Sequence, residues 1–348
     1  MDLLFAQRLK NARVMQGLSM DELCNKMDGI VSKQSISKYE SGKMMPNSSV
    51  LLALSKALNV TTDYFFRSGI CLENVEFRKK SSLGRKKEAQ ITEIVRDHLE
   101  RYILIEQIVL MNVPFINPIK QIKINDNSDI ETAVRELRKS WWIGMDSLPN
   151  ITELLEDKGV KIIEIEADNK FDGLSANVNN GTIPVIVVNK QLPVERKRFT
   201  CMHELGHLLL HLSPKLDEHT KERYCHYFAN AMLLPKDAFL REIGLKRSHL
   251  SMSELIPIKE YFGISVAAIL MRAHDLNVIS PSYYKNFYIN FLTKNRSEVG
   301  LGDYPGREGS NRFMQLLYRA TSEELISMSR AAEIANMKLA DYREAYMA

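Results

Sequence analysis

The side chains best suited to chemistry lie in residues 198–211, which read RFTCMHELGHLLLH. If this stretch forms a helix, His203 and His207 lie one turn apart on the same face, and two imidazoles at that spacing can bind one zinc ion. Glu204 would lie beside the metal, where it could take a proton from a bound water. The surrounding residues are mostly apolar, which predicts a buried helix whose ionisable groups need a partner such as a metal. Because H-E-x-x-H also arises by chance, the prediction depends on a third ligand.

That third ligand is predicted on a second helix, over residues 222–234, where apolar residues recur at helical spacing until Pro235 ends the helix. A carboxylate on a helix following the H-E-x-x-H helix is the usual third ligand of a catalytic zinc site, and water keeps the fourth position. Glu222 is the predicted ligand. Glu218 and Asp217 are nearby alternatives, which we expect in the connecting loop.

The two stretches, F-T-x-x-H-E-L-G-H-L-L-L-H and E-x-x-x-x-x-F-A-x-x-L-L-P, resemble the ImmA/IrrE family of zinc metallopeptidases. The resemblance covers roughly residues 135–275 and includes residues 171–176 and 184–189, which look like the family's substrate-side strands. It implies Zn2+ as the cofactor and Glu222 as the ligand that opens the second motif. It also implies that the substrate is a repressor or another regulatory protein.

The sequence departs from this family at Cys225-His226, where alanine followed by asparagine or aspartate is usual. The residue four positions after the ligand commonly orients a metal-bound histidine, and His226 could do so through a hydrogen bond. The oxyanion of peptide hydrolysis also needs a donor besides zinc. The candidates are Tyr224, Tyr227, His226 and His211, of which His211 extends the first helix face by one more turn and is more readily explained as a structural residue.

Residues 1–66 have the spacing of a compact bundle of short helices. Ser19 and Ser32 can each cap a helix, the second of which is predicted from Lys33 to Ser41. Two helices joined by a short turn, the second rich in lysine, glutamine and serine, are typical of a helix-turn-helix. The turn over residues 28–31 is about two residues longer than usual, which could shift the angle of the second helix.

The string L-S-x-x-E-L, followed by S-x-x-x-I-S-K-Y-E-S-G-x-x-x-P and L-x-x-L-S-x-x-L-x-V, resembles the XRE/lambda-repressor-like DNA-binding family. The resemblance implies that the second helix enters the major groove and presents its polar residues to base edges. Gln34 could bond adenine bidentately, the lysines could reach guanine or phosphate, and Ser32 suits a phosphate. The predicted DNA-binding residues are Ser32, Lys33, Gln34, Ser35, Ser37 and Lys38.

Other residues of this segment are expected to be structural. Ile36 belongs to the core, Tyr39 is a second candidate for it, and the resemblance implies that Arg13 pairs with Glu40. A plain helical bundle with a solvated lysine face is the alternative to a DNA-binding domain.

The rest of the chain is predicted in three parts. Residues 67–128 hold a connector and a long helix over about residues 84–112. Two basic clusters, 78–80 and 85–87, lie in this segment. Such charge runs are usually solvated surface, and the alternative is contact with DNA phosphates. Residues 129–275 hold the peptidase-like domain, with a strand at 160–165, a strand at 184–189, and Trp141-Trp142 in the core. Residues 276–348 form a helical region whose default role is packing or dimerisation.

Composition sets outer limits on function. A chain of 348 residues, 45% of them hydrophobic, can build two or three domains with real cores. No apolar run reaches the length of a membrane span and the N-terminus lacks a signal-peptide pattern, so we expect a cytoplasmic protein. Four scattered cysteines without a C-x-x-C pair suit a reducing compartment. The net charge of +4 says little about nucleic acid.

These features together predict a mostly helical α+β protein. It has an all-α helix-turn-helix domain at residues 1–66, a long connecting helix, and a zincin-like domain with a small sheet. The predicted function is a DNA-binding transcriptional regulator whose zinc-dependent endopeptidase cleaves a regulatory protein. The alternative is a repressor, or the antitoxin of a toxin–antitoxin pair, whose metal domain only senses or scaffolds. Expected partners are a double-stranded DNA operator, a protein substrate, a partner repressor or toxin, and a second copy in a homodimer, with no membrane. Glu204, which scaffolding alone would not need, favours the peptidase.

Overall fold

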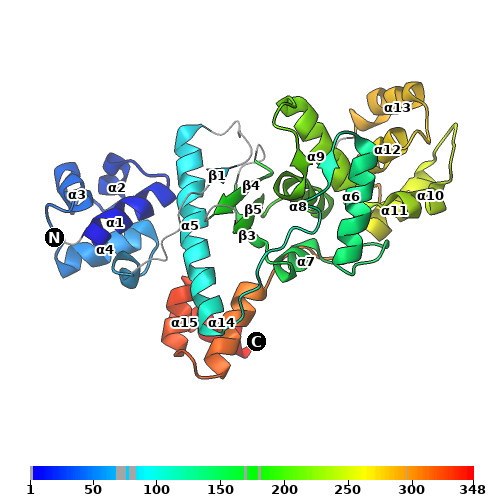
Figure 1. The fold of residues 1–348 in the computed structure, drawn as a ribbon. Coiled ribbons are helices and arrows are strands. Elements are labelled where there is room, and N and C mark those ends of the chain that lie inside the picture. Colours follow the sequence, from blue (N-terminus) through cyan, green and yellow to red (C-terminus); the bar gives the residue numbers. More distant parts are fainter. Residues whose placement is uncertain (1–2, 68–75, 78–83, 168–170, 179–181, 296) are drawn as a thin grey trace. The chain divides into compact units, whose positions relative to one another are not determined.

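The computed structural model describes residues 3–67, 76–77, 84–167, 171–178, 182–295 and 297–348, shown in Figure 1. The chain divides into two compact units. The first comprises residues 1–75, 80–112 and 311–348, and the second comprises residues 76–79 and 113–310. Helices dominate both units and the strands form two small sheets, so the predicted mostly helical α+β class is confirmed.

The first unit begins with a bundle of helices around one apolar core. Its elements are α1 (Leu3–Met15), α2 (Met20–Lys26), α3 (Lys33–Glu40), α4 (Ser48–Leu58) and the 3-10 helix η1 (Thr62–Phe65). The predicted caps are present: Ser19 and Glu22 form a capping box at α2, and the Ser32 side chain accepts a hydrogen bond from the Ser35 amide at α3. Ile36 and Tyr39 face the core, as expected.

Two features fix α3 within this bundle. Arg13 donates from Nε and one terminal nitrogen to the two carboxylate oxygens of Glu40, at 2.6 and 2.7 Å, which confirms the expected pair. The turn before α3 contains two consecutive left-handed residues, Asp28 and Gly29, after which Ile30 is exposed and Val31 is buried. The longer turn is therefore absorbed by backbone geometry at its tip.

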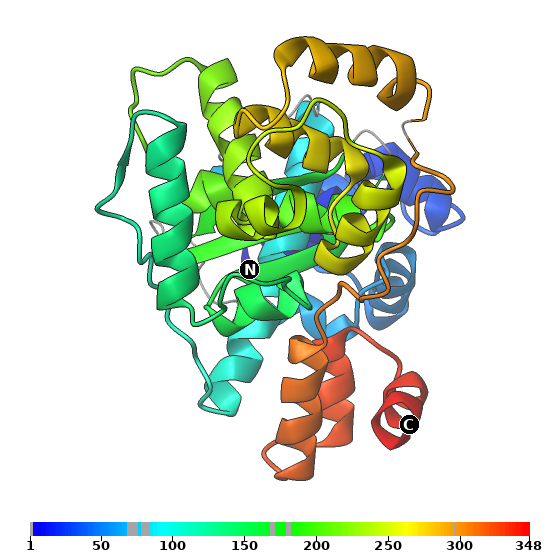
Figure 2. The ribbon, with the colours of Figure 1, turned by 90° about the vertical axis from the view of Figure 1, so that its right-hand side faces the viewer.

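The long helix α5 (Arg85–Ile108) is the other main element of this unit. Its buried Glu100 accepts a 2.6 Å hydrogen bond from Arg8 of α1. Further along, it packs against α14 (Arg312–Ser322) and α15 (Met328–Ala335), and α16 (Leu339–Met347) packs against α15. These three C-terminal helices are drawn orange to red in Figure 2. Tyr102 and Ile105 of α5 share one core with Leu317 and Tyr342. Residues 311–348 thus complete the unit that contains α5.

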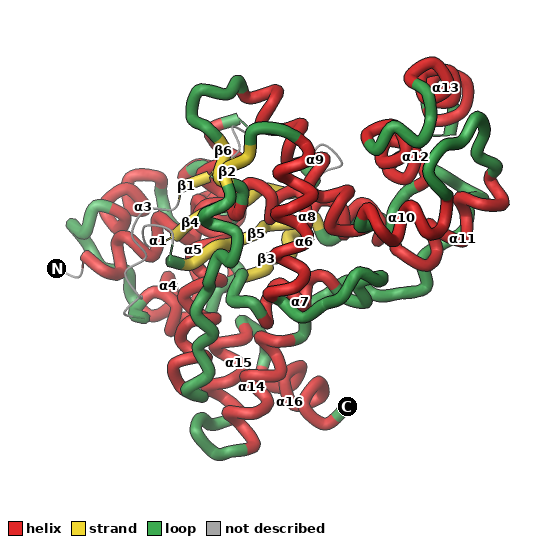
Figure 3. The backbone as a smooth tube through the Cα atoms, turned by 45° about the vertical axis from the view of Figure 1, so that its right-hand side comes forward, coloured by secondary structure: helices red, strands yellow, loops and turns green. Residues whose placement is uncertain are grey.

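The second unit is built on a four-stranded sheet of order β1-β4-β5-β3, yellow in Figure 3. Its strands are β1 (Glu76–Phe77), β4 (Gly173–Val178), β5 (Ile183–Asn189) and β3 (Lys161–Ile165). β5 runs parallel to β3 and antiparallel to β4, and β4 is antiparallel to β1. The run Val185 to Val188 is fully buried, as expected for an inner strand covered on both faces.

The helix α8 (Val194–Leu209) packs directly on β4 and β5 of this sheet. A short parallel pair, β2 (Lys123–Ile124) and β6 (His211–Leu212), lies at the end of α8. The other helices of the unit are α6 (Asn127–Ser140), α7 (Ile151–Asp157), α9 (Glu218–Leu233), α10 (Lys236–Ile243), α11 (Met252–Phe262), α12 (Val266–Asp275), α13 (Pro281–Phe287) and the π-helix η2 (Tyr288–Leu292).

The structure differs from the sequence-based expectation at Trp142 and at residues 76–77. The predicted core pair Trp141-Trp142 is wrong for its second member: Trp141 is 5% exposed, but Trp142 is 92% exposed. Trp141 is the C-cap of α6 and Trp142 adopts a left-handed φ of 59°, so the chain turns away and the second ring points to solvent.

Residues 67–83 were expected to be connector only, yet Glu76 and Phe77 join the sheet. The basic cluster 78–80 lies outside the described residues.

Two further observations bear on the composition arguments. Within the described ranges, no helix is long and apolar enough to cross a membrane. Cys24, Cys201 and Cys225, the cysteines of those same ranges, form no disulfide there, and the latter two are fully buried.

The core between α5 and α14 predicts a pH-dependent stability. The ring of His98 lies 5.4 Å from that of Phe313 and 6.1 Å from that of Tyr102, and burial lowers the pKa of His98 to about 3. The unfolded chain binds a proton below its ordinary pKa of about 6.5, whereas the folded chain does not. Stability should therefore be full above that pH and fall between it and about 3, by at most about 1.4 kcal/mol per pH unit.

His98→Phe keeps a ring in this core and removes the titration. Thermal unfolding from pH 7.5 to 4.5 should show a shallower loss of Tm in His98→Phe than in the wild-type chain. Equal slopes in the two proteins would show that His98 is not the group that titrates.

Candidate metal centre and nucleic-acid interface

The helix α8 carries the H-E-x-x-H residues on one buried face. Pro193 precedes the helix and Leu209 ends it, so the whole motif is helical as predicted. His203 is 4% exposed, and its Nε2 lies 3.1 Å from the Nε2 of His207. The two rings meet edge to face, with centroids 4.8 Å apart. Both Nε2 atoms therefore point to one position beside α8.

The helix α9 brings Glu222 to the same position. Glu222 Oε2 lies 3.2 Å from His203 Nε2, and Oε1 lies 3.4 Å from His207 Nε2. The two alternative ligands are used elsewhere: Asp217 caps α9 by accepting from the Thr220 amide, and Glu218, which begins the helix, pairs with Lys221 at 2.7 Å. The structure thus brings together the three residues that the sequence selected.

The spacing of these three donor atoms fits a metal ion. Ligands about 2.0–2.1 Å from a tetrahedral zinc are about 3.3 Å from one another, and the observed separations are 3.1, 3.2 and 3.4 Å. Two imidazole nitrogens and one carboxylate oxygen are also a common donor set for zinc with an open fourth position. Among the residues that the structure describes, His203, His207 and Glu222 form the single cluster able to hold an ion.

Glu204 lies next to this cluster in an enclosed position. It is 1% exposed, and its Oε2 has no hydrogen-bond partner among the described residues. A Cβ on Gly173 of β4 would lie 3.7 Å from Glu204 Cγ and would collide with Thr200 Cγ2 at 2.7 Å, so only glycine lets the strand approach this closely. A buried carboxylate oxygen without a partner is costly unless a water or ligand occupies the site.

His226 contacts the cluster in a different way from the one predicted. Its ring lies 4.3 Å from the ring of His203 and stacks on Phe199, while His203 Nδ1 has no hydrogen-bond partner in the described part of the chain. His226 therefore packs against His203 and does not orient it by a hydrogen bond. Instead, Cys225 Sγ lies 3.5 Å from His207 Nδ1. The sequence distinguished Cys225 only as a departure from the family pattern, and only its place three residues after Glu222 could have indicated this contact.

The other proposed oxyanion donors point elsewhere. The Tyr224 hydroxyl donates to the Asn125 carbonyl at 2.6 Å, and the Tyr227 hydroxyl donates to Glu131 at 2.7 Å. His211 does not extend the helix face, because α8 ends at Leu209 and His211 lies in β6, exposed, near the Lys120 carbonyl. The described residues leave the exposed His226 as the remaining candidate of the four.

The second candidate site is the exposed face of α3. Ser32, Lys33, Gln34, Ser37 and Lys38 are exposed, whereas Ser35 is half-buried. Lys33 forms a 2.6 Å ion pair with Asp21, and the Ser32 hydroxyl caps the helix. Gln34, Ser37 and Lys38 form no hydrogen bond in the described residues through their side chains, so the face can present donors and acceptors to a ligand.

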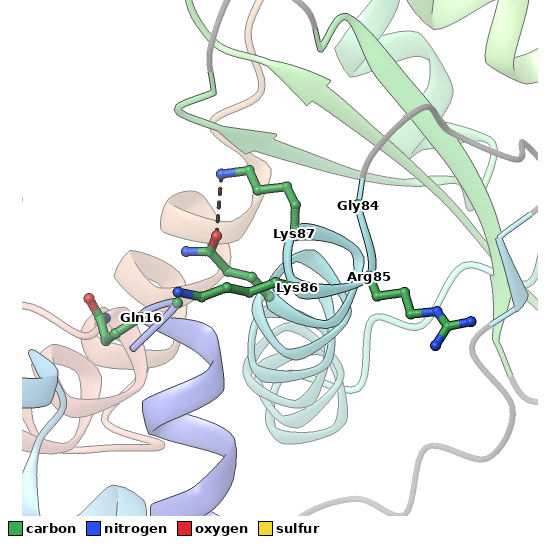
Figure 4. Close-up of a pocket in the computed structure, with 7 residues that line it drawn as sticks. Gln16, Gly84, Arg85, Lys86 and Lys87 are labelled. Carbon is green, nitrogen blue, oxygen red and sulfur yellow. Dashed lines mark hydrogen bonds between the residues drawn. The ribbon is translucent and has the colours of Figure 1, made fainter. Parts of the chain in front are cut away.

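The basic cluster at the start of α5 lines a hollow of about 550 Å³ with Gln16 and Gly17 (Figure 4). Arg85 and Lys86 are exposed, and Lys86 lies 3.7 Å from Glu22. Lys87 donates to Gln90 at 3.3 Å, and Gln90 donates to the Met15 carbonyl. Through the contact between Lys86 and Glu22, this cluster places positive charge beside α2.

Comparison with known proteins identifies both regions. A peptidase family model described as an IrrE N-terminal-like domain matches residues 155–274, and a helix-turn-helix model matches residues 9–65. The first match contains α8 and α9, and the second contains α2 and α3. The two matches indicate a DNA-binding regulator and a protease-like domain. No curated protein matches the sequence.

The geometry of the cluster makes metal binding testable. Purified protein should hold about one zinc per chain, and the double substitution His203→Ala/His207→Ala should remove it because only a single protein ligand would remain. His211→Ala is the matched control, since His211 lies outside the cluster. Elemental analysis that finds equal zinc in the wild type and the double variant would exclude this site.

Proposed function

We propose that this chain, a helix-turn-helix domain fused to an IrrE N-terminal-like domain, is a transcriptional regulator that also cleaves a regulatory protein as a zinc-dependent endopeptidase. The observation that carries the proposal is the position of Glu204. A buried carboxylate oxygen without a described partner, beside three converging metal-binding side chains, is expected of a general base and is not needed for a scaffold.

His203, His207 and Glu222 would hold the zinc, each through the atom that faces the common position. When bound, zinc would supply Lewis acidity. Glu204 would take a proton from the attacking water and later transfer it to the leaving amine. The contact between Cys225 Sγ and His207 Nδ1 would keep the Nε2 of His207 free to bind metal.

The sheet offers a place for the substrate backbone. Gly173 of β4 approaches Glu204, since its Cα lies close enough for an added Cβ to reach Glu204 Cγ at 3.7 Å. We infer that an extended peptide lies near this strand, with its scissile bond close to the base.

The helix-turn-helix domain would bring the protein to its operator. The exposed side chains of α3, Ser32, Lys33, Gln34, Ser37 and Lys38, together with the half-buried Ser35, would contact double-stranded DNA. We infer that the protein acts as a homodimer, because helix-turn-helix proteins commonly bind two half-sites about one helical turn apart. If proteolysis is absent, the remaining function is a repressor or antitoxin that binds a toxin and uses the metal only for folding or sensing.

The exposed face of α3 generates a test of sequence-specific binding. Gln34→Ala should relax the preference at one or two base positions, by about 1–3 kcal/mol each. Replacing Arg85, Lys86 and Lys87 by glutamine should weaken binding to all sequences and flatten its salt dependence, because fewer phosphates are neutralised. Selection from random DNA followed by titration at several salt concentrations measures both effects, with the exposed Lys236→Gln as control. A selection that returns no enriched motif would end this assignment.

The position of Glu204 generates the test of proteolysis. Glu204→Gln keeps the size of the side chain and removes the base, so zinc and DNA binding should persist while turnover falls by at least about 100-fold. The matched control is Glu218→Gln, which changes an exposed carboxylate at the start of α9.

The readout is the expression of the controlled genes beside mass spectrometry for shortened partner proteins. Gene induction that is unchanged in Glu204→Gln, with no shortened protein in wild-type cells, would remove the peptidase and favour the repressor or antitoxin. Loss of induction in Glu204→Gln but not in Glu218→Gln is the expected result.

A further inference from the structure

A cleft of about 1080 Å³ begins at the metal cluster and extends along α9. Glu222, His226 and Asn230 all line it, and their spacing of four residues places them on one face of the helix. The two turns from Glu222 to Asn230 span about 12 Å. An extended peptide covers that distance with about three to four residues. The cleft thus leads from a metal-binding side chain to a point several residues along a bound chain.

The far part of this cleft contains a polar group that the fold does not use. Asn230 is 3% exposed, and its Oδ1 has no hydrogen-bond partner among the described residues. Its neighbours on α9, Ala229, Ala231 and Met232, are fully buried and apolar. A buried carbonyl oxygen left unpaired lowers stability, so a leucine of similar size would serve the fold better at this position. An unpaired acceptor on the wall of a cleft is expected where a ligand supplies the donor.

Other groups in the cleft are compatible with a donor-bearing ligand. Asp275, at the end of α12, lies 3.7 Å from His274 Nδ1, and the charges of Arg272 and Arg223 also act on it. By contrast, Glu195 and Glu298, which also line the cleft, are paired, because Lys259 contacts both. The rings of Tyr284 and Tyr288, with centroids 6.1 Å apart, add flat apolar walls beside His274.

We infer that this cleft binds the substrate peptide and that Asn230 selects a side chain that donates hydrogen bonds, namely lysine, arginine, glutamine or asparagine. The inference rests on the proposed peptidase function and deepens it, since it names the substrate class. Asn230 accepts from the donor, and Asp275 and the tyrosine rings line the same cleft. The selected residue lies about three to four positions from the scissile bond.

The test compares stability with selectivity. Asn230→Leu should leave Tm equal or raise it, because it removes an unpaired buried polar group, and should bind donor-bearing peptides about tenfold more weakly. Two zinc-loaded proteins would each be used to select peptides from a random dodecapeptide library displayed on phage. The first carries Glu204→Gln, and the second carries both Glu204→Gln and Asn230→Leu. We expect one position enriched in donor-bearing side chains with the first protein and in apolar side chains with the second. Asn25→Leu, at an exposed site on α2, is the control.

Three outcomes would overturn the inference. The first is a lowered Tm in Asn230→Leu, which would show that the amide is structural. The others are identical peptide selection by the two proteins and the absence of any selected peptide. Cleavage of the selected peptides by the wild-type chain is measured separately. Peptides that are selected through Asn230 but never cut would contradict the proposed endopeptidase while the cleft assignment stands. Peptides that are cut without any preference changed by Asn230→Leu would contradict the assignment alone.

Discussion

The close contact between α8 and α9 at Gly206 determines the geometry of the metal cluster. A Cβ on Gly206 would lie 3.1 Å from the Phe228 ring and 3.3 Å from Cys225 Cα, so even an alanine would require α9 to give way by a few tenths of an ångström. Glu222 lies one turn before Cys225 on α9, and its carboxylate reaches His203 and His207 only at this separation. The same contact places Cys225 Sγ against His207 Nδ1. One glycine thus permits the three ligands and the contact behind them.

Fully buried arginines hold these helices from outside the contact. Arg138 of α6 donates to the carbonyls of Gly144, Asp146 and Met232, and Arg272 of α12 donates to the Leu234 carbonyl and to Glu131. The end of α9 is therefore fixed by two guanidinium groups. A buried charge without partners would be very costly, so these geometries tolerate little movement. That rigidity suits a site whose ligand atoms must stay about 3 Å apart.

The sequence could predict what depends on local spacing. His203, His207 and Glu222 lie within two helices whose periods and ends are readable, and the caps at Ser19 and Ser32 follow from neighbouring residues. Long-range packing could not be predicted from the sequence. The two-residue strand Glu76–Phe77 is too short to show a periodicity, and the packing of residues 311–348 on α5 joins segments far apart in the chain. Trp142 was misplaced because composition does not reveal a left-handed backbone at the end of α6. Asn230 looked like one residue of an apolar helix, and only its missing partner distinguishes it.

The central claim is that two histidines and one glutamate hold a zinc ion next to a free carboxylate. Zinc K-edge X-ray absorption on the loaded protein tests it most directly, because nitrogen and oxygen ligands lie at about 2.0–2.1 Å and a thiolate at about 2.3 Å. The structure predicts nitrogen and oxygen only, with two imidazoles, since Cys225 Sγ contacts the outer Nδ1 of His207 and not the common position of the Nε2 atoms. A sulfur shell at about 2.3 Å would contradict the account, because it would make Cys225 a ligand and displace one of the three predicted residues.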